Sequence, residues 1–277
     1  MMNVRRLLKE FDIQPRKGLG QNFLTDQRAL ERIVEAAELG PEDIVLEIGS
    51  GLGTLTRLLA AEAGQVVAIE LDQRLVEVLK KTLADLPNVE IIHGDILELT
   101  PADLLEQQMA SFQYKVVANL PYYITSAILR HLLTAKIKPK LMVVTVQLEV
   151  AQRIVAQPGD MSLLAVSVQF YGRPRIVTRI KASAFYPSPQ VDSAVIRIDL
   201  DGRPLVEVDD ADSFFEVVRA GFAQRRKQLR NALAAQLALP ANEVAQALTR
   251  AGVNPKRRAQ TLSIEEWVRV WRECRHS

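Results

Sequence analysis

Short apolar runs rich in β-branched residues alternate with helical patterns through the first two thirds of the chain. Strands are predicted at 44–48, 66–70, 89–93, 115–119 and 141–147. The helices predicted between them lie near 54–63, 73–86, 101–109 and 124–134. Apolar strands that alternate with helices indicate a parallel sheet covered on both faces. Two later runs, 175–180 and 194–200, have only a loop between them, which predicts an antiparallel hairpin at the end of the sheet.

The pattern changes near Asp201-Gly202-Arg203-Pro204, beyond which the periodic segments are helical. Helices are predicted over 211–223, 226–237, 242–251 and 264–274. We therefore expect an α/β domain over residues 1–204 and a small all-α domain over residues 205–277. A chain of 277 residues is long enough for a large domain followed by a small one.

The composition is that of an ordinary globular protein, with 48% hydrophobic and 25% charged residues, and it excludes wholesale disorder. No apolar run approaches the ~20 residues of a membrane span, and the N-terminus lacks the apolar core of a signal peptide. Cys274 is the only cysteine, which excludes an internal disulfide and a thiolate-rich zinc site. The three histidines, His93, His131 and His276, show no metal-ligand spacing. We expect a cytoplasmic protein without a metal.

Basic residues gather toward the C-terminal end. From Ser213 onward there are twelve Lys or Arg and five Glu, whereas residues 1–212 hold 23 basic and 28 acidic residues. A basic segment on a slightly acidic body is typical of a module that faces a polyanion. A solvated helix surface explains the charge alone equally well.

Polar or glycine-rich elements follow four successive predicted strands. The first strand ends in Glu47-Ile48-Gly49-Ser50-Gly51-Leu52-Gly53, whose glycines allow a sharp turn and a close approach to a ligand. Glu70 ends the second strand, Asp95 follows the third, and Asn119 ends the fourth. The carboxyl ends of parallel strands are the edge at which open α/β sheets bind ligands. The sequence therefore predicts a nucleoside site there, with Glu70 accepting hydrogen bonds from ribose hydroxyls.

The glycine pattern narrows the choice of nucleoside cofactor. A dinucleotide fingerprint needs Gly or Ala at the sixth position of G-x-G-x-x-G, where this chain has Thr54. No lysine of the kind that cradles ATP phosphates follows the turn. A G-x-G-x-G turn with Glu70 and Asp95 resembles the S-adenosylmethionine site of Rossmann-like methyltransferases, and NAD is the poorer fit.

The segment Asn119-Leu120-Pro121-Tyr122 suits an amine that is conjugated with a purine ring. The Asn119 carboxamide oxygen and the carbonyl of Leu120 can each accept a hydrogen bond from the amine, and Tyr122 offers a flat face for the base. Two acceptors draw the amine toward tetrahedral geometry and aim its lone pair at a methyl group, so positioning and electrostatics supply the catalysis. A simple turn at the end of a strand is the alternative for these four residues alone.

A second aromatic element lies between the last two predicted strands, in Phe185-Tyr186-Pro187-Ser188-Pro189-Gln190-Val191-Asp192-Ser193. Two prolines restrict the shape of this loop, and Phe185 is placed to form the opposite wall of a pocket for an extruded base. In isolation, a rigid loop with a core phenylalanine explains the same residues better.

The chain resembles the ribosomal RNA adenine N6,N6-dimethyltransferase family, in its bacterial small-subunit branch. The matching segments span residues 20 to 263 and are Gly20 to Leu24, Glu47 to Gly53, Glu70, Asp95, Asn119 to Tyr122, Phe185 to Ser193, Phe222 to Lys227, Leu229 to Asn231, and Arg257 to Ser263. The resemblance implies a Rossmann-like methyltransferase domain and a helical rRNA-binding domain. Tyr123 stands where some members carry Asn, outside the four residues that face the target base.

The resemblance also implies a role for each matching residue. Asn22 and Leu24 would contact the methionine end of S-adenosyl-L-methionine, which the turn at Gly49 and Gly51 lets approach. Glu70 would hold the ribose, Asp95 the adenine amine, and Asn119 the target amine beside the cofactor. Leu120 and Pro121 would complete the turn, with Tyr122 and Phe185 stacking on the target base.

The family's substrate is a pair of adjacent adenosines in the 3′-terminal hairpin of small-subunit (16S) rRNA, each of which receives two methyl groups. The resemblance implies action on an assembling 30S subunit, a checkpoint role in its maturation, and a monomeric protein. Two basic clusters, Arg225, Arg226, Lys227, Arg230 and Lys256, Arg257, Arg258, are suited to rRNA phosphates, the first of them on a predicted helix.

Three other interpretations compete with this one. A methyltransferase of the macrolide-resistance type would modify one adenosine of large-subunit rRNA, and the C-terminal sequence argues against it. A non-catalytic assembly factor on the same scaffold would not need Asn119, Tyr122, Asp95 and Glu70 intact. A nicotinamide-dependent oxidoreductase fits the glycine spacing less well.

Overall fold

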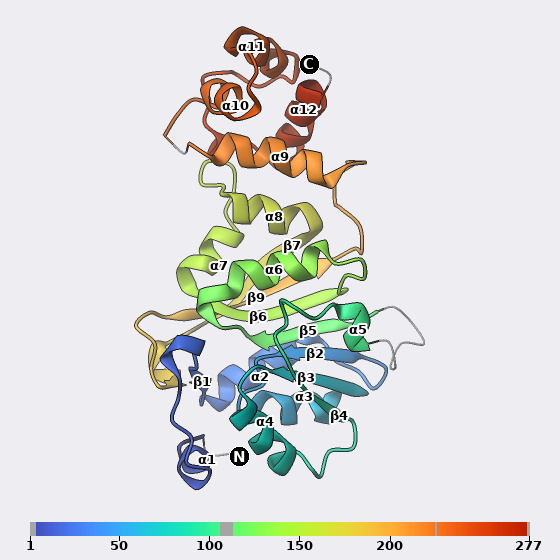
Figure 1. Ribbon diagram of the computed structural model, residues 1–277, viewed down its shortest axis with the longest axis vertical. Coiled ribbons are helices and arrows are strands. Elements are labelled where there is room, and N and C mark those ends of the chain that lie inside the picture. The colour runs from blue at the N-terminus through green and yellow to red at the C-terminus, as the bar shows by residue number, and fades with distance from the viewer. Residues whose placement is uncertain (1–3, 106–112, 225, 276–277) are drawn as a thin grey trace. The chain divides into compact units, whose positions relative to one another are not determined.

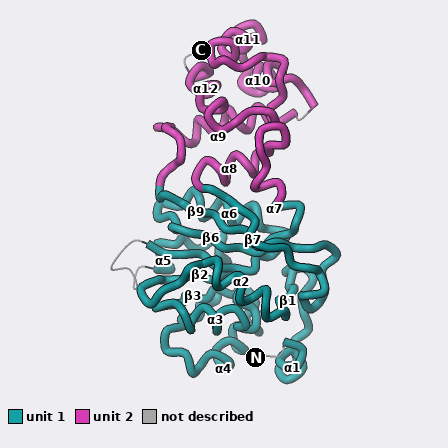
Figure 2. Tube along the Cα trace, turned by 180° about the vertical axis from the view of Figure 1, so that it is seen from behind, with its two compact units in different colours: residues 1–151, 173–202 teal, residues 152–172, 203–277 magenta. Residues whose placement is uncertain are grey.

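The computed structural model describes residues 4–105, 113–224 and 226–275 (Figure 1). They form two compact units, one of residues 1–151 with 173–202 and the other of residues 152–172 with 203–277 (Figure 2). The second unit thus includes a segment, 152–172, that lies inside the range expected for the first domain. The chain therefore crosses between the units more than once.

The first unit is built on a mostly parallel sheet. In the described part of the chain its seven strands have the order β4-β3-β2-β5-β6-β9-β7. Strands β2 to β6 are parallel, whereas β9 runs antiparallel to β6, and β7 occupies the edge beyond β9. The bounds are β2 (Ile44–Ile48), β3 (Gln65–Glu70), β4 (Val89–His93), β5 (Lys115–Asn119), β6 (Leu141–Gln147), β7 (Gly172–Ile180) and β9 (Ser193–Leu200). The expected mixed α/β architecture is confirmed.

The helices of the first unit include the four predicted between the strands, in the predicted order, and others besides. They are α1 (Val4–Glu10), α2 (Gln27–Ala37), α3 (Thr54–Glu62), α4 (Gln73–Thr82), α5 (Pro101–Leu105) and α6 (Thr125–Thr134), and α7 (Leu148–Ile154) begins in this unit. Helix α6 lies in front of the sheet in Figure 1. The predicted helix at 101–109 is seen as α5, and its remaining residues lie outside the described part.

Helix α2 shows how local sequence and core packing combine. It begins after Asp26, whose side chain accepts a hydrogen bond from the Ala29 N–H at 2.8 Å and so caps the helix. Its apolar stripe includes Leu30 and Ile33, which are buried in one cluster with Val143 of β6 and residues of α3. The 3.6-residue period of this stripe therefore fixes which face of α2 covers the sheet.

A short ladder ties the N-terminal segment to the loop between β7 and β9. Strand β1 (Phe23–Leu24) pairs antiparallel with β8 (Phe185–Tyr186), with Leu24 opposite Phe185. The Thr25 N–H and hydroxyl both donate to the Ala184 carbonyl at 2.8 Å. No helix longer than the 3₁₀ turn Ala182–Ala184 interrupts this loop, as the sequence indicated, but the two-residue strands were not predicted.

The amino end of β5 is anchored by a buried cation. Lys115 is 6% exposed, and its Nζ donates to Asp43 Oδ2 at 2.8 Å and to the carbonyl of Ala37 at 2.9 Å. Asp43 is also paired with Lys140 at 2.8 Å. Burial raises the pKa of Asp43, but the two lysines outweigh it and hold that pKa below its ordinary value. The end of α2 and the start of β5 are thereby fixed together.

The second unit is helical. Its elements are α8 (Leu163–Tyr171), α9 (Ala211–Phe222), α10 (Leu229–Leu237), α11 (Ala241–Arg250), the 3₁₀ turn η4 (Ala259–Thr261) and α12 (Ile264–Arg275). Phe170 of α8 stacks on Phe214 of α9 with ring centroids 4.8 Å apart, and Trp267 of α12 is fully buried. Helix α8 escaped prediction because its sequence is apolar on nearly all sides and shows no amphipathic period.

Candidate functional site

A pocket opens at the carboxyl ends of β2, β3, β4 and β5 in the first unit. Besides the N-terminal segment 19–23, its lining includes Gly94, Tyr123 and Ile124. Most of the residues singled out from the sequence for the cofactor and the target base line it, namely Asn22, Gly49, Gly51, Glu70, Asp95, Asn119, Leu120, Pro121 and Tyr122. The structure therefore brings together residues that are up to a hundred positions apart in the chain.

The glycine turn after β2 has the conformation that its sequence requires. Gly49 and Gly51 have φ of +73° and +60°, a region that other residues rarely adopt. A Cβ at Gly51 would come within 3.1 Å of the Phe23 ring, so a side chain there would displace the pocket wall. The Gly49 N–H donates to the Ile69 carbonyl at 2.9 Å, which holds the turn against β3.

Glu70 stands at the end of β3 and organises the backbone around the pocket. Its two carboxylate oxygens accept hydrogen bonds from the Gly51 N–H and the Asp72 N–H, both at 2.9 Å. Burial raises the pKa of Glu70 above its ordinary value, and these backbone donors oppose the rise. Each oxygen keeps a further lone pair, so the carboxylate can also accept from hydroxyl groups of a ligand in the pocket.

Asn119 presents an unused acceptor. Its Nδ2 donates to the Asn22 carbonyl at 3.0 Å, which fixes the orientation of the amide. Its Oδ1 is buried and has no hydrogen-bond partner. Buried polar atoms are normally paired, so an unpaired acceptor at the pocket indicates the place of a donor group supplied by a ligand.

The turn after Asn119 is rigid. The Leu120 side chain is buried and its N–H donates to the Thr145 carbonyl at 3.2 Å, so Leu120 contributes main chain rather than side chain to the pocket. The Tyr122 hydroxyl lies 2.6 Å from Ser193 Oγ, a contact between β9 and the 3₁₀ turn Tyr122–Ile124. This bond holds the ring of Tyr122 in place along the pocket.

Two further side chains complete the wall. Asp95 accepts the Leu97 N–H at 2.9 Å through Oδ1 and is half-buried at the pocket. Tyr123 is 56% exposed, and a Cβ on Gly20 would meet its ring at 3.2 Å. Tyr123 thus places an exposed aromatic ring at the pocket, although no role was predicted for it.

The structure does not bring Leu24 or Phe185 to the pocket. Both are 3% exposed and belong to the core cluster that also contains Leu30 and Ile33. The β1–β8 pairing places them opposite each other and so directs both toward this core. A stacking role for Phe185 would require its ring to leave the core, and this role stays a prediction.

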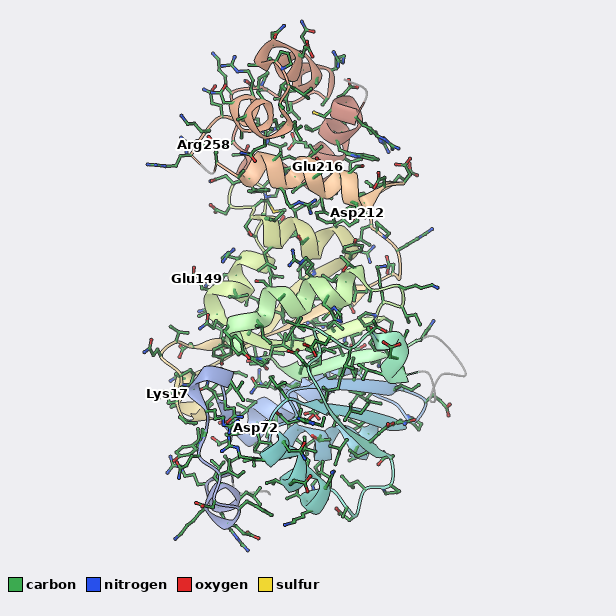
Figure 3. The ribbon with its side chains drawn as sticks, in the orientation of Figure 1. Lys17, Asp72, Glu149, Asp212, Glu216 and Arg258 are labelled. Carbon is green, nitrogen blue, oxygen red and sulfur yellow. The ribbon has the colours of Figure 1, made fainter. Side chains whose placement is uncertain are left out.

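A charged network that was not predicted fixes the N-terminal segment beside the pocket. Gln21 Nε2 donates to Asp72 Oδ2 at 3.0 Å, and the Gln21 side chain accepts from the Arg16 N–H at 2.7 Å. Arg74 Nη2 lies 2.6 Å from Asp72 Oδ2 and is the main cause that lowers the pKa of Asp72 to about 2. Lys17 and Asp72, labelled in Figure 3, lie on the two segments that the network joins. Asp72 is also the N-cap of α4, and its side chain accepts a hydrogen bond from the Arg74 N–H.

Glu47, just before the glycine turn, is a buried acid. It is 2% exposed and its Oε2 has no hydrogen-bond partner. Burial raises the pKa of Glu47 to about 8, and the nearby hydroxyls of Thr56 and Ser50 offset this only in part. The folded protein therefore keeps a proton on Glu47 in the pH range where the unfolded chain has lost it.

We expect Glu47→Gln to stabilise the protein increasingly as the pH rises from about 5 to 8. Across this window Glu47 ionises in the unfolded chain but stays protonated in the folded protein. The free energy of unfolding of the wild type therefore falls as the pH rises, whereas that of the neutral variant does not. The gain in free energy of unfolding should reach about 1–3 kcal/mol at pH 8. Urea unfolding at both pH values measures it, with the exposed Glu62→Gln as the control. A gain that is equal at both pH values would contradict this ionisation.

The basic clusters of the second unit come together, but not on one helix. Arg226 and Lys227 lie in the turn between α9 and α10, because α10 begins only at Leu229. The expectation of a helix from Arg226 was therefore wrong. The Leu229 N–H donates to the Arg257 carbonyl at 2.7 Å, which brings the turn beside the second cluster. Arg225 lies outside the described residues.

The basic side chains of the two clusters differ in their exposure and in their contacts within the protein. Arg226, Lys227, Lys256 and Arg258 are exposed, and Arg258 is labelled in Figure 3. Arg257 is half-buried and forms a two-point ion pair with Glu266 at 2.5 and 3.0 Å, and Arg230 Nε donates to the neighbouring Asn231 side chain at 3.2 Å. The four exposed side chains are therefore the ones best placed to meet a ligand.

The described residues hold no cluster of three or more His, Cys, Asp or Glu that could bind a metal ion. Among the helices that the structure describes, none is long and apolar enough to cross a membrane.

The pocket fits S-adenosylmethionine on its own chemistry. The buried Glu70 carboxylate can accept from ribose hydroxyls, and Asp95 can accept from an adenine amine. The positive φ values of the glycine turn leave its backbone open to a close approach by the methionine end. The described residues that line the pocket include no lysine for phosphates.

Comparisons with known proteins agree with this chemistry. A protein-family model described as ribosomal RNA adenine dimethylase matches residues 13–275 of this chain. A Dehalococcoides mccartyi protein named ribosomal RNA small subunit methyltransferase A is 50% identical over 268 residues, covering 96% of this chain and 91% of its own. A protein of the same name from Moorella thermoacetica is 45% identical, covering 98% and 96%.

Solved structures share the fold. The crystal structure of the 23S rRNA methyltransferase ErmE has a TM-score of 0.72 and 32% identity, covering 91% of this chain and 99% of its own. A dimethyladenosine transferase from Plasmodium falciparum has a TM-score of 0.74 at 24% identity, covering 90% and 95%. With the family model matched almost from end to end, this chain belongs to the ribosomal RNA adenine dimethylase family.

Proposed function

We propose that this protein transfers methyl groups from S-adenosylmethionine to the N6 amines of two adjacent adenosines in the 3′-terminal hairpin of small-subunit rRNA, two methyl groups to each. The observation that carries the proposal is the buried, unpaired Oδ1 of Asn119, held inward by the bond from Nδ2 to the Asn22 carbonyl. A neutral acceptor fixed at the pocket suits a substrate that brings an N–H group.

The residues of the pocket would divide the work between cofactor and base. S-adenosylmethionine supplies an electrophilic methyl group on its sulfonium. Glu70 holds the ribose hydroxyls, Asp95 holds the adenine amine, and Asn22 and the turn at Gly49 border the methionine end. Tyr122, fixed by Ser193, offers its ring face to the target base.

Asn119 would act on the target amine itself. The N6 lone pair of adenine is delocalised into the ring, which makes the amine a poor nucleophile. An N–H donated to Asn119 Oδ1, and a second to the Leu120 carbonyl, draw the nitrogen toward tetrahedral geometry and localise its lone pair. Because these acceptors are fixed before the base arrives, little reorganisation is needed in the transition state. Each N6–methyl bond would form as the sulfonium–methyl bond breaks and leaves a thioether, and the N6 proton would be lost to water, so the chemistry requires no covalent intermediate with the protein.

The small subunit is favoured over the large subunit by the comparisons. Two relatives named small-subunit methyltransferase A are 50% and 45% identical to this chain, whereas the 23S rRNA methyltransferase ErmE is 32% identical. A purely structural assembly factor would not need a buried unpaired acceptor, which costs stability without a ligand. We infer an assembling 30S subunit as the partner, a monomeric enzyme, and a cytoplasmic location.

The deciding experiment is methyl transfer from labelled S-adenosylmethionine to small ribosomal subunits that lack this modification, followed by identification of the digested nucleosides. N6,N6-dimethyladenosine confined to the 3′-terminal hairpin is the expected product. Modification of large-subunit rRNA instead would support the macrolide-resistance type. Binding to small subunits without any transfer would support the assembly-factor alternative.

We also propose that the exposed basic side chains of the second unit bind rRNA phosphates. Arg226, Lys227, Lys256 and Arg258 come from two segments that the Leu229–Arg257 main-chain bond holds together. Phosphate contacts of this kind set the register of a protein on RNA without reading its sequence. Arg257, which is paired with Glu266, and Arg230, which donates to Asn231, would support this surface rather than contact the RNA directly.

The triple variant R226Q/K227Q/R258Q is expected to weaken binding to small subunits about tenfold or more and to reduce the salt slope of binding by about 3. Each lost contact leaves one phosphate without its cation, so counterion release falls. Binding measured from low to physiological salt tests this, with R153Q/R203Q/R219Q as a control on exposed arginines of the same unit. A variant that matches the control in affinity and slope would show the clusters to be a solvated surface.

A further inference from the structure

A second basic surface lies in the first unit, and neither the sequence patterns nor the family description assigned it a role. It is a groove between the N-terminal half of α2 and the end of β7 with the turn that follows. Its polar lining consists of Asp26, Arg28, Arg32, Thr178, Arg179, Lys181 and Ser183. We call it the α2–β7 groove.

The cations of the α2–β7 groove converge from two elements. Arg28 and Arg32 are four positions apart on α2 and so lie on one face of the helix. Arg179 and Lys181 are two positions apart along an extended segment, which directs both side chains to one side. All four are exposed. Arg32 Nη1 reaches Thr178 Oγ1 at 3.4 Å and so links the two walls.

None of these four cations forms an ion pair with an acid within the described residues. The acid in the lining, Asp26, has its Oδ1 engaged by the Ala29 N–H as the cap of α2. Arg197 of β9, at the C-terminal end of α2, shows the contrast, because Glu38 and Asp199 hold it at 2.5 and 2.7 Å. The groove thus keeps a net positive charge that the protein does not neutralise.

The donors of the groove match phosphate oxygens. Guanidinium groups, a lysine ammonium and two hydroxyls are the side chains that bind phosphate most often in nucleic-acid complexes. Four converging cations also repel one another, and a polyanion along the groove would relieve this repulsion. An extended strand fits better than a single anion, since the cations are spread along two elements rather than around one point.

Two short stretches of chain connect the groove to the pocket. Asp26 follows Asn22 of the pocket wall by four residues, so these two positions are no more than about 14 Å apart. On the other side, Lys181 leads through Ala184 into β8, which pairs with β1. The Thr25–Ala184 hydrogen bonds close this connection. A strand that lies in the groove would therefore reach the pocket within a few nucleotides.

We propose that the α2–β7 groove binds backbone phosphates of the substrate RNA strand next to the nucleotide whose base enters the pocket. This inference rests on the proposed function, since it takes the RNA substrate as given. It adds a contact surface within the catalytic unit to the basic side chains of the second unit. Its role is to position the strand, and none of its side chains takes part in the chemistry.

The test compares the variant R32Q/R179Q with the control R130Q/K136Q, which removes two exposed cations elsewhere in the same unit. With unmethylated small subunits as substrate, the groove variant should raise KM about tenfold and leave kcat within about twofold, because the reacting groups are untouched. The salt slope of subunit binding should fall by about 2. The Kd for S-adenosylmethionine should not change, and R32K/R179K should restore most of the affinity.

The proposal is overturned if KM and salt slope of R32Q/R179Q match those of the control. It is also overturned if R32K/R179K fails to restore binding, since a phosphate contact needs only the charge. Failure of the proposed function looks different: the wild-type protein would then give no dimethyladenosine in small subunits. In that case the salt dependence of small-subunit binding still tests the groove, because this measurement does not require methyl transfer.

Discussion

Asn119→Ala is expected to lower the rate of methyl transfer about 100-fold to 1,000-fold while small-subunit binding remains. In the proposed mechanism the variant removes the fixed acceptor that would localise the lone pair of the amine, an interaction that would gain strength only in the transition state. Losing one preorganised hydrogen-bonding group of this kind costs other enzymes a similar factor. Single-turnover rates with saturating S-adenosylmethionine and subunits measure the effect on the chemical step.

Asn88→Ala is a matched control for this variant. The Asn88 Nδ2 also donates to main-chain carbonyls, those of Ala60 and Ala63 at 2.8 and 3.1 Å, but Asn88 does not line the pocket. It should lose stability and keep its rate. A rate for Asn119→Ala within tenfold of wild type would refute the acceptor role. Joint loss of transfer and subunit binding would indicate damage to the fold of the pocket instead.

Glu70→Ala is expected to weaken S-adenosylmethionine binding about 10-fold to 100-fold. A hydrogen bond to a buried carboxylate contributes about 1.5–3 kcal/mol, and the ribose hydroxyls would lose theirs. The same change leaves the N–H groups of Gly51 and Asp72 without their acceptor, so the free energy of unfolding should fall by about 1–3 kcal/mol. Calorimetric titration and urea unfolding give the two quantities separately.

The comparison variant for Glu70 is Asp43→Asn, which neutralises a half-buried acid just before the amino end of β2. Asp43 pairs with Lys115 and Lys140 and is remote from the pocket lining. It should lower stability and leave the Kd for S-adenosylmethionine unchanged. An unchanged Kd in a folded Glu70→Ala protein would exclude Glu70 from the cofactor site.

The parts of the fold that depend on short-range patterns were predictable. Strands β2 to β6 match their predicted runs to within a residue, since apolar β-branched runs between turns report on strands locally. The strand ends then place Glu70, Asp95 and Asn119 at one edge, because parallel strands share their direction. The Asp26 cap of α2 follows from equally local chemistry.

What could not be predicted depends on contacts between distant residues. The bond from Tyr122 to Ser193 joins positions 71 apart. For Phe185 the sequence left a core position and a pocket wall both open, and its pairing opposite Leu24, far away in the chain, places it in the core. Arg226 fits a helical pattern, but α10 begins only at Leu229, whose N–H donates to the distant Arg257 carbonyl. The four cations of the α2–β7 groove come from two segments about 150 residues apart, with no motif in either.

The two ends of strand β5 contribute to different properties of the protein. Its first residue, Lys115, anchors the sheet through Asp43 and the end of α2, and its last residue, Asn119, carries the unpaired acceptor about 13 Å away. We expect changes around Lys115 to alter the stability of the sheet, and changes around Asn119 to alter methyl transfer. Substitutions near the amino end of β5 could therefore adapt a related protein to a different growth temperature while the residues at the carboxyl end, and the reaction, stay unchanged.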